Sequence, residues 1–303
     1  MKNIILDTDL GGDCDDASAI ALANKFFNNG EVNVLAMTYS NNDNDGALLT
    51  SVINKYYGND FPVGLLKNSE LKIQYGIDMV EKTLEILGIE KDYSKLQNAN
   101  DLYYEKLMNA EDNSVTVICI GQLRNVAVFL ESDFNGVSGQ EIFNRKVKEL
   151  YIMGGYFNQE SEYYSFCGCV MSGEYNIVTD VHSARTIMEK VETNIIFCDW
   201  DIGVDVLTFE KFSTNYNEKY PVSICYKLYQ NGARHSWDPI TVLYAIKGDN
   251  EYFSSKVGNV SINEKGRTFF EENTCGKHRI MLLAKPKEEV AKYLESFFKK
   301  ELN

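Results

Sequence analysis

The chain has 303 residues, with 30 basic and 44 acidic side chains, which gives a net charge of −14 at pH 7. This negative charge repels polyanions, and the Lys and Arg residues are scattered, so we expect no nucleic-acid partner. No stretch approaches the roughly 20 apolar residues that a membrane-spanning helix needs, so we also expect no membrane partner. The apolar segment before Asp7 is too short for a signal peptide, which together with seven cysteines lacking a CxxC pair favours a cytoplasmic protein with reduced thiols.

Short apolar runs alternate with longer helical patterns along the chain, which is typical of βαβ units and of a mostly parallel sheet. No linker-like composition divides the sequence, so we expect a single α/β domain over residues 1–303. The predicted strands are, in chain order, residues 3–6, 32–38, 61–65, 115–120, 150–153 and 193–197. The predicted helices are residues 17–27, 46–57, 123–130 and 287–300.

One segment, residues 158–173, shows no regular period and contains several aromatic residues. Long irregular segments inside α/β domains are often binding loops, and the tyrosines favour a packed loop over disorder. Within it, Cys167 and Cys169 are two residues apart, which is not a usual zinc spacing.

Five carboxylates follow the first predicted strand within ten residues, and a predicted helix begins directly after them; they are Asp7, Asp9, Asp13, Asp15 and Asp16. In a parallel sheet this places them at the carboxyl end of the strand, where open α/β sheets bind ligands. Such a group cannot remain fully charged without compensation, and a hard divalent cation is the natural counter-charge. Gly11 and Gly12 would let the chain turn back so that residues on both sides reach one ion.

Three alternatives compete with a metal site. Helix capping would explain Asp15 or Asp16 but not five aspartates. An EF-hand loop would need an acidic or amide residue in place of Gly11. A magnesium-dependent aspartyl phosphohydrolase with Asp7 as the nucleophile would need Thr or Val at the same position.

The aspartate segment resembles the opening D-x-D-P-G-x-D-D of the inosine-uridine preferring nucleoside hydrolase family, with Leu10 in place of proline and two extra residues, Asp13 and Cys14. Further family-like motifs follow in the same order along the chain; they are residues 35–42, 120–125, 152–155, 174–177 and 237–239. The resemblance implies a nucleoside hydrolase-like fold and calcium-dependent cleavage of the N-glycosidic bond of a ribonucleoside, giving ribose and free base in purine or pyrimidine salvage. It also implies a homodimer or homotetramer.

The resemblance further implies a role for each matching residue. Asp9, Asp16 and Asp238 would bind Ca²⁺ through their side chains and Ile120 through its backbone carbonyl, and Asp9 would act as the general base on a metal-bound water. The substrate would be bound by Asp15, Asn41, Asn42, Met153, Glu174, Asn176 and Trp237. Asn125 is expected to cap the following helix.

The chain departs from the family on the side that would face the base. Trp237 stands where many members carry the histidine that protonates the leaving base, although its ring could stack on a base. His235 is therefore a candidate leaving-group acid, and Gly168 replaces a family asparagine. These departures leave open a rival function, a non-catalytic ribosyl- or nucleoside-binding protein that retains the metal site.

Overall fold

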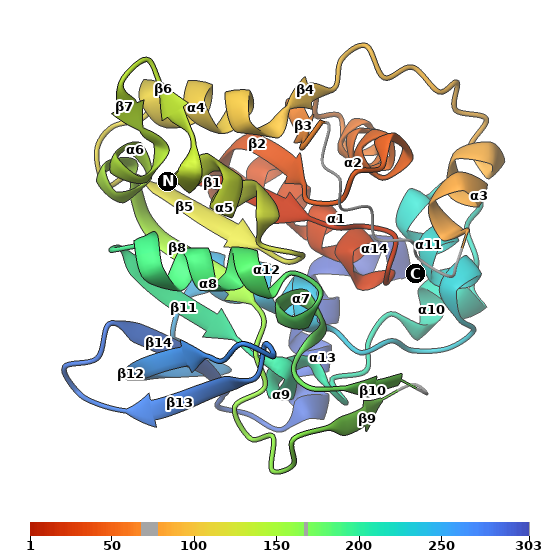
Figure 1. Cartoon of the computed structure of the whole chain (residues 1–303). Helices are drawn as coiled ribbons and strands as arrows, with labels where there is room; N and C mark the ends of the chain where they lie inside the picture. The colour runs from red at the N-terminus through yellow and green to blue at the C-terminus, as the bar shows by residue number, and fades with distance from the viewer. Residues whose placement is uncertain (68–77, 167–168, 303) are drawn as a thin grey trace.

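The computed structural model describes residues 1–67, 78–166 and 169–302. Within these residues, ten strands form one sheet (Figure 1). They are β1 (Lys2–Thr8), β2 (Val32–Tyr39), β3 (Val63–Leu65), β4 (Gln97–Asn98), β5 (Val115–Cys119), β8 (Val147–Met153), β11 (Asn194–Cys198), β12 (Phe253–Ile262), β13 (Thr268–Glu272) and β14 (His278–Leu283). Two small hairpins lie outside it, β6 (Asp133–Phe134) with β7 (Val137–Ser138), and β9 (Tyr164–Phe166) with β10 (Cys169–Met171).

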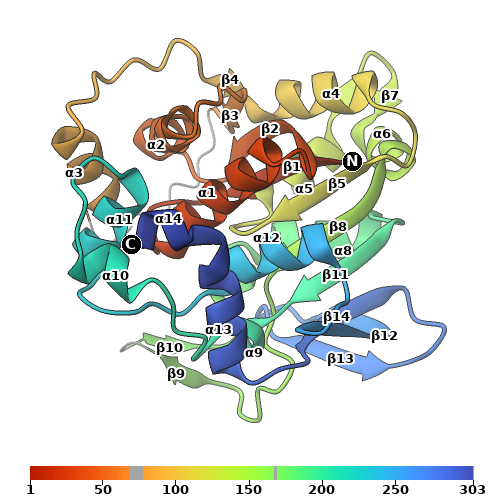
Figure 2. The ribbon, with the colours of Figure 1, turned by 180° about the vertical axis from the view of Figure 1, so that it is seen from behind.

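Helices cover both faces of the sheet (Figures 1 and 2). One face carries α1 (Asp15–Asn28), α2 (Asn44–Tyr56), α11 (Pro221–Tyr229), α12 (Trp237–Lys247) and α13 (Lys287–Glu295). The other carries α4 (Ala99–Asn109), α5 (Arg124–Glu131), α6 (Gly139–Lys146) and α8 (Val181–Lys190). The remaining helices are α3 (Met79–Ile86), α7 (Tyr175–Val178), α9 (Trp200–Gly203), α10 (Glu210–Thr214), a 3₁₀ turn (Ser296–Phe298) and α14 (Lys299–Leu302).

The centre of strand β1 is a continuous apolar run, without alternating polar residues, because both of its faces are buried. Successive side chains point to opposite faces, so Ile4 and Leu6 pack into the core beneath α1 while Ile5 packs into the core beneath α4 and α5. All three side chains are fully buried. Because helices cover both faces of this strand, its central residues, 4–6, are all apolar.

The strand order is β13-β12-β14-β11-β8-β5-β1-β2-β3-β4. The chain runs from β1 outward to β4 on one side and then returns to β5 on the other side of β1. Pairing is parallel except where β12 meets β13 and β14, so the predicted mostly parallel α/β fold is confirmed. The reversal places the carboxyl ends of β1 and β5 at the point where such sheets leave a crevice for a ligand.

The structure confirms each predicted strand and helix in type and shifts most of the boundaries. The segment 158–173 was predicted to be irregular, and this is wrong in part because β9 and β10 pair there, with Tyr164 opposite Met171. Three-residue strands are too short to give a clear alternating pattern. The helix predicted at 287–300 is interrupted after Glu295 by the 3₁₀ turn. Cys167 and Gly168 lie outside the described residues.

Candidate active site

The loop between β1 and α1 holds the aspartates at the carboxyl edge of the sheet. Gly11 has φ +142°, a conformation that favours glycine, and α1 begins at Asp15. The hydroxyl of Thr8 donates a hydrogen bond of 2.5 Å to Oδ1 of Asp16, and the backbone N–H of Asp9 donates to the same oxygen at 3.3 Å. The end of the strand therefore fixes the first turn of the helix.

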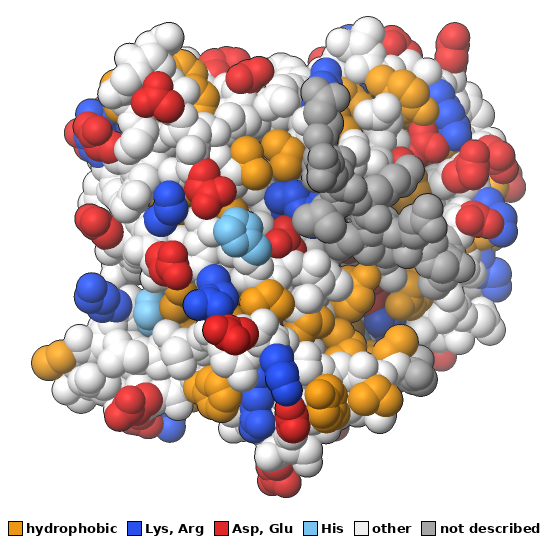
Figure 3. All heavy atoms as spheres, viewed as in Figure 1, with side chains coloured by type: hydrophobic (Ala, Val, Ile, Leu, Met, Phe, Trp, Pro, Cys, Tyr) orange, Lys and Arg blue, Asp and Glu red, His pale blue; other side chains and the backbone are white. Residues whose placement is uncertain are grey.

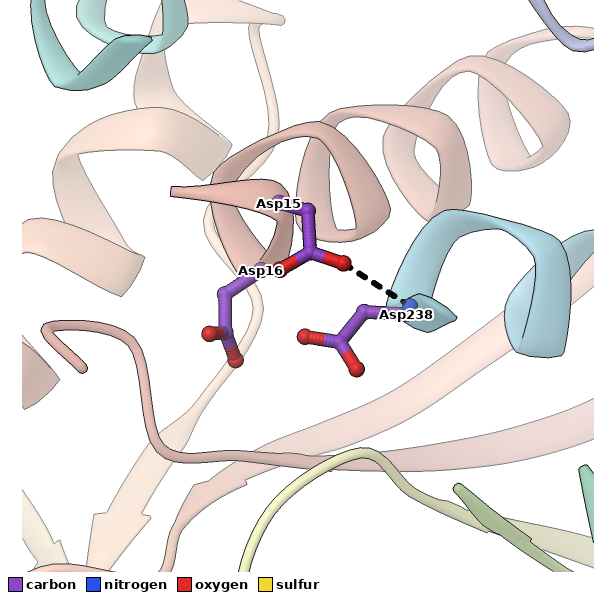
Figure 4. A group of neighbouring side chains, drawn as sticks. All are labelled: Asp15, Asp16 and Asp238. Atoms are coloured by element: carbon purple, nitrogen blue, oxygen red, sulfur yellow. Dashed lines mark hydrogen bonds between the residues drawn. The ribbon is translucent and has the colours of Figure 1, made fainter. Parts of the chain in front are cut away.

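A second segment, more than 220 residues further along the chain, completes this group. Oδ2 of Asp15 accepts hydrogen bonds from the backbone N–H groups of Trp237 (3.0 Å) and Asp238 (3.1 Å), which joins the N-termini of α1 and α12 (Figure 4). Asp15, Asp16 and Asp238 each offer a carboxylate oxygen, and these oxygens lie within 4.8 Å of one another. All three side chains are buried.

The charges of this triad are not balanced by the residues around it. Burial raises the pKa of Asp16 well above 3.8, and the negative charges of Asp9 and Asp15 raise it further. Burial and the charges of Asp15 and Asp16 act in the same way on Asp238. Buried carboxylate oxygens that repel one another are the ligand set that a hard divalent cation stabilises, so the residues fit a metal ion.

Asp9 lies beside the triad and is held by the segment after β5. Nε2 of Gln122 donates a 2.7 Å hydrogen bond to Oδ2 of Asp9. A Cβ on Gly121 would lie 2.7 Å from the Asp9 carboxylate, so only glycine permits this approach. Ile120 precedes it, with its N–H bonded to the carbonyl of Asp7 at 2.8 Å, and lines the same cavity as Asp9.

Glu174 and Asn176, at the start of α7, line the same cavity. The Glu174 carboxylate accepts hydrogen bonds from the backbone N–H groups of Asn176 (2.9 Å), Ile177 (3.3 Å) and Gly155 (3.3 Å). Burial raises the pKa of Glu174 to about 7, and these three N–H groups oppose the shift. Nδ2 of Asn176 donates to the carbonyl of Met153 at 3.2 Å, which ties α7 to the end of β8.

These residues line a cavity of about 320 Å³, and its lining side chains fall into two chemically different groups, which we call the carboxylate end and the aromatic end. The carboxylate end is formed by Asp9, Asp15, Asp16, Glu174, Asn176 and Asp238. The aromatic end is formed by Phe166, Tyr175, Trp200, Tyr229, Arg234 and Trp237. A larger cavity of about 800 Å³ lies between α2 and residues 87–97, but it does not contain the buried carboxylate triad, so chemistry rather than volume selects the smaller one.

Two indole rings dominate the aromatic end. The centroids of Trp200 and Trp237 are 4.9 Å apart, and Nε1 of Trp237 donates a 2.8 Å hydrogen bond to the carbonyl of Trp200. Phe166 packs edge-on against Trp200 at 4.4 Å. Trp200 lies on α9, directly after β11, and Phe166 comes from β9, so three distant segments build this wall.

The structure brings most of the predicted site residues into this one cavity; they are Asp9, Asp15, Asp16, Ile120, Met153, Glu174, Asn176, Trp237 and Asp238. Asn41 and Asn42 are not among the described residues that line it; Oδ1 of Asn41 instead accepts the N–H of Asn42 at 2.8 Å. His235 also lies outside the described lining, and its Nδ1 accepts the Asp205 N–H at 2.9 Å.

The structure does not support the roles that the sequence suggested for Asn125 and Asp7. Asn125 does not cap a helix; it lies within α5, and its Nδ2 donates to Asp7 at 3.1 Å. Asp7 also accepts a hydrogen bond from Tyr103 at 3.3 Å and is not among the described residues lining the cavity, which gives a nucleophilic role no support. Its side chain belongs to the buried core beside β5 instead.

Sequence reasoning missed several cavity residues, among them Trp200, Tyr229 and Arg234. It also missed Gln122, which is not among the described lining residues but holds the Asp9 carboxylate. Gln122 lies within the family-like motif at residues 120–125, so its position shortly after β5 could have identified it as a site residue. Trp200, Tyr229 and Arg234 lie on short helices or loops that are far along the chain from the aspartates after β1. Only the fold brings them to the cavity.

The family model for inosine-uridine preferring nucleoside hydrolases matches residues 4–294. The chain belongs to this family. In a search of the curated proteins, no sequence matched the chain. The family match covers both the β1–α1 aspartates and α12, the two segments that form the carboxylate triad.

Several solved structures are similar to this nucleoside hydrolase family member over nearly the whole chain. A plant nucleoside hydrolase, PpNRh1, is 21% identical with a TM-score of 0.70, covering 98% of each chain. An inosine-uridine preferring nucleoside hydrolase from Bacillus anthracis is 16% identical with a TM-score of 0.70, covering 99% of this chain and 100% of that one. The type III effector XopQ, complexed with adenosine diphosphate ribose, is 13% identical with a TM-score of 0.71, covering 100% and 94%.

The structure contains, in its described residues, no helix that is both long and apolar enough to cross a membrane. On the face shown in Figure 3, the described Lys and Arg side chains are interspersed with Asp and Glu.

Proposed function

We propose that the protein hydrolyses the N-glycosidic bond of a ribonucleoside to ribose and free base, with Ca²⁺ as its cation. The observation that carries the proposal is the buried triad of Asp15, Asp16 and Asp238, which lies beside Asp9 in a cavity whose other end is aromatic. A nucleoside has the matching polarity, with a hydroxyl-rich sugar at one end and a flat base at the other. Membership of the family supports the same reaction.

The residues that would hold the ion are Asp9, Asp16 and Asp238, with Ile120 through its carbonyl. Asp15 shares its Oδ2 with two backbone N–H groups, so we assign it to holding α12 and to contacting the sugar. When bound, a divalent cation of this type lowers the pKa of a water molecule.

Asp9 is the residue placed to take a proton from the attacking water. The hydrogen bond from Gln122 fixes the orientation of its carboxylate, as a general base requires. The oxygen of the water forms a bond to the anomeric carbon while the carbon–nitrogen bond to the base breaks. Positive charge then spreads over the sugar ring, as in glycoside hydrolysis generally, and the carboxylate end stabilises that charge.

Glu174 and Asn176 would bind ribose hydroxyls, and Met153 would line the sugar subsite. At the other end, the ring of Trp237 would stack on the base. Asn41, Asn42 and His235 remain predictions for substrate binding and for leaving-group protonation, and their position outside the cavity lining does not support them.

A second candidate function is binding of a ribosyl compound without turnover. Trp237 cannot deliver a proton to a departing base, and a structure of the same fold was determined with adenosine diphosphate ribose bound. The residues that bind a ribosyl group would be the same in both functions. Turnover alone separates the two.

Release of reducing sugar from purine, pyrimidine and nicotinamide ribosides tests the proposal. We expect the wild-type protein with Ca²⁺ to cleave at least one riboside and the Asp9→Ala variant to lose that activity. Binding of a riboside with no release of sugar would establish the second candidate instead. If the protein neither binds nor cleaves any of these ribosides, both candidate functions are contradicted.

We also propose that residues 1–303 act as one catalytic domain in a cytoplasmic homodimer or homotetramer, without nucleic-acid or membrane partners. Light scattering at several protein concentrations measures the mass directly. A monomer at all concentrations would contradict the assembly.

A further inference from the structure

An ion pair lies at the aromatic end of the cavity. Nε of Arg234 donates hydrogen bonds to both carboxylate oxygens of Asp13, at 2.9 and 3.0 Å, and Nη2 donates to Oδ2 as well. The Arg234 side chain is 7% exposed and that of Asp13 is 22% exposed. Asp13 belongs to the two extra residues by which the aspartate loop departs from the family pattern, so the departure and the arginine are physically linked.

Asp13 engages only one edge of the guanidinium. A guanidinium carries its N–H groups in a planar fork, and the pair uses Nε and Nη2. Among the described residues, no hydrogen-bond acceptor is found for Nη1. The guanidinium carbon lies 4.8 Å from the ring centre of Tyr229 and 5.5 Å from that of Trp237, and all three residues line the cavity. Arg234 therefore has donor capacity where a base would lie.

The aromatic end has no other described side chain that could act on the departing base, because neither Trp237 nor His235 is available for that role. The Nε1–H of Trp237 is hydrogen-bonded to the carbonyl of Trp200, and an indole does not transfer its proton as an acid. His235 is not among the described residues lining the cavity, and its Nδ1 is occupied by the Asp205 N–H. Arg234 is the one Lys or Arg among the described lining residues.

We propose that Arg234, oriented by Asp13, contacts the departing nucleobase and stabilises the negative charge that develops on it. This inference rests on the proposed hydrolase function. As the carbon–nitrogen bond breaks, its electron pair moves to the base nitrogen, while the oxygen of water bonds to the anomeric carbon and Asp9 takes the water proton. The base leaves as an anion hydrogen-bonded to Arg234 and takes its proton from solvent afterwards.

Arg234 keeps its own protons throughout this step. Burial alone would lower its pKa, but the hydrogen bonds and the charge of Asp13 raise the pKa above its ordinary value. The guanidinium thus acts by charge-assisted hydrogen bonding, as the donors of an oxyanion hole do. A phosphorylated substrate fits less well, because one arginine faces carboxylates from Asp9, Asp13, Asp15, Asp16, Glu174 and Asp238 in the same cavity.

The test compares two ribosides that differ in how much help the leaving group needs. Inosine loses a poor leaving group, whereas para-nitrophenyl riboside loses a phenolate that departs without assistance. For the Ca²⁺-loaded Arg234→Met variant, we expect kcat on inosine to fall about 10²-fold, the loss typical of one removed anion-stabilising donor. On para-nitrophenyl riboside we expect kcat to change less than about threefold, with KM near the wild-type value for both.

Two further variants keep the test decisive if Arg234→Met fails to fold. Arg234→Lys retains a cation without the fork and should recover part of the inosine activity. Asp13→Asn should lower inosine turnover more than para-nitrophenyl riboside turnover, because Asp13 acts through Arg234. Arg124→Met is the matched control, since it removes another buried arginine paired with an aspartate, Asp180, outside the cavity. It should leave the ratio of the two activities unchanged.

Equal losses on both substrates, or no loss on inosine, would overturn the role of Arg234. If the wild-type protein cleaves neither these two ribosides nor any other purine, pyrimidine or nicotinamide riboside, the hydrolase function itself fails, and the inference fails with it. If the wild-type protein cleaves para-nitrophenyl riboside, but the variants lose the same fraction of activity on both substrates, the role of Arg234 is refuted and the hydrolase function stands.

Discussion

The two ends of the cavity are held in different ways. At the carboxylate end, Asp16 is hydrogen-bonded to the last residue of β1, and Asp15 is bonded to the backbone at the start of α12. At the aromatic end, the side chains of Phe166, Trp200 and Trp237 hold mostly one another, and they come from a hairpin and two helix starts. Backbone anchoring leaves the carboxylates little freedom, whereas ring packing tolerates exchange of one apolar surface for another.

This contrast predicts that small changes at the carboxylate end lower catalysis at least as much as the removal of a whole side chain at the aromatic end. Because the carboxylates must meet one ion and the attacking water, displacements well below 1 Å matter there. The aromatic end contributes stacking area, which is lost in proportion to what is removed.

Asp16→Asn should have the largest effect, because it removes one charge from the triad. We expect Ca²⁺ affinity to fall and turnover to drop about 10³-fold, equivalent to several kcal/mol of lost stabilisation. The metal-free variant should melt at a higher temperature than the metal-free wild type, since mutual repulsion is relieved. Calorimetry with and without Ca²⁺ measures both effects. Asp249→Asn, an exposed change outside the cavity, serves as the control, and a metal-free variant that melts lower than wild type would contradict the electrostatic account.

Gly121→Ala probes the same end through one methyl group. Its Cβ would approach the Asp9 carboxylate to 2.7 Å, so Asp9 must move and turnover should fall about 10²-fold. Gly64→Ala provides a matched control, because its Cβ would also be crowded, 3.0 Å from Ala99, but outside the cavity lining. Equal activities of the two variants would show that the position of Asp9 is not critical.

Trp237→Ala tests the aromatic end. Loss of one stacking surface should lower kcat/KM for nucleosides by about 10- to 100-fold while leaving Ca²⁺ affinity nearly unchanged. Trp237→Phe keeps an aromatic face and should retain most of the activity. A loss of Ca²⁺ affinity as large as that of Asp16→Asn would show that the two ends are not separable.

Asp199→Asn should give the smallest effect and concerns the segment that positions Trp200. Burial, and then the charge of Asp201, raises the pKa of Asp199 from 3.8 to about 7. Between about pH 4 and pH 7 the folded protein therefore keeps a proton that the unfolded chain has released, so stability falls as the pH rises through this range.

For this one group, the free energy of unfolding should fall by on the order of 2 kcal/mol between pH 5 and pH 8. The asparagine variant should lack that part of the decline, as urea unfolding at the two pH values would measure. Identical declines in both proteins would contradict the raised pKa.

The sequence predicted the carboxylate end well for a physical reason. Its residues follow parallel strands or begin helices, so a strand pattern followed by Asp9, Asp15 and Asp16 already places them at one edge of the sheet. Asp238 could be added only through the resemblance, because no local pattern shows that α12 meets α1.

The aromatic end was largely out of reach of sequence reasoning. Trp200, Tyr229 and Arg234 lie in segments whose position depends on tertiary packing, and the short strands β9 and β10 lack a readable period. The strands β12, β13 and β14, which contain the antiparallel pairing of the sheet, were missed as well, although they extend the sheet at the edge far from the aspartates.

The most direct test of the account is the return of activity as Ca²⁺ is added to chelator-treated protein. We predict that metal-free protein releases no ribose from the riboside it prefers, and that activity rises in step with the binding of one ion per chain. Full hydrolysis by metal-free protein would contradict the central role of the buried aspartates. Binding of one ion without cleavage of any riboside would contradict the proposed hydrolysis.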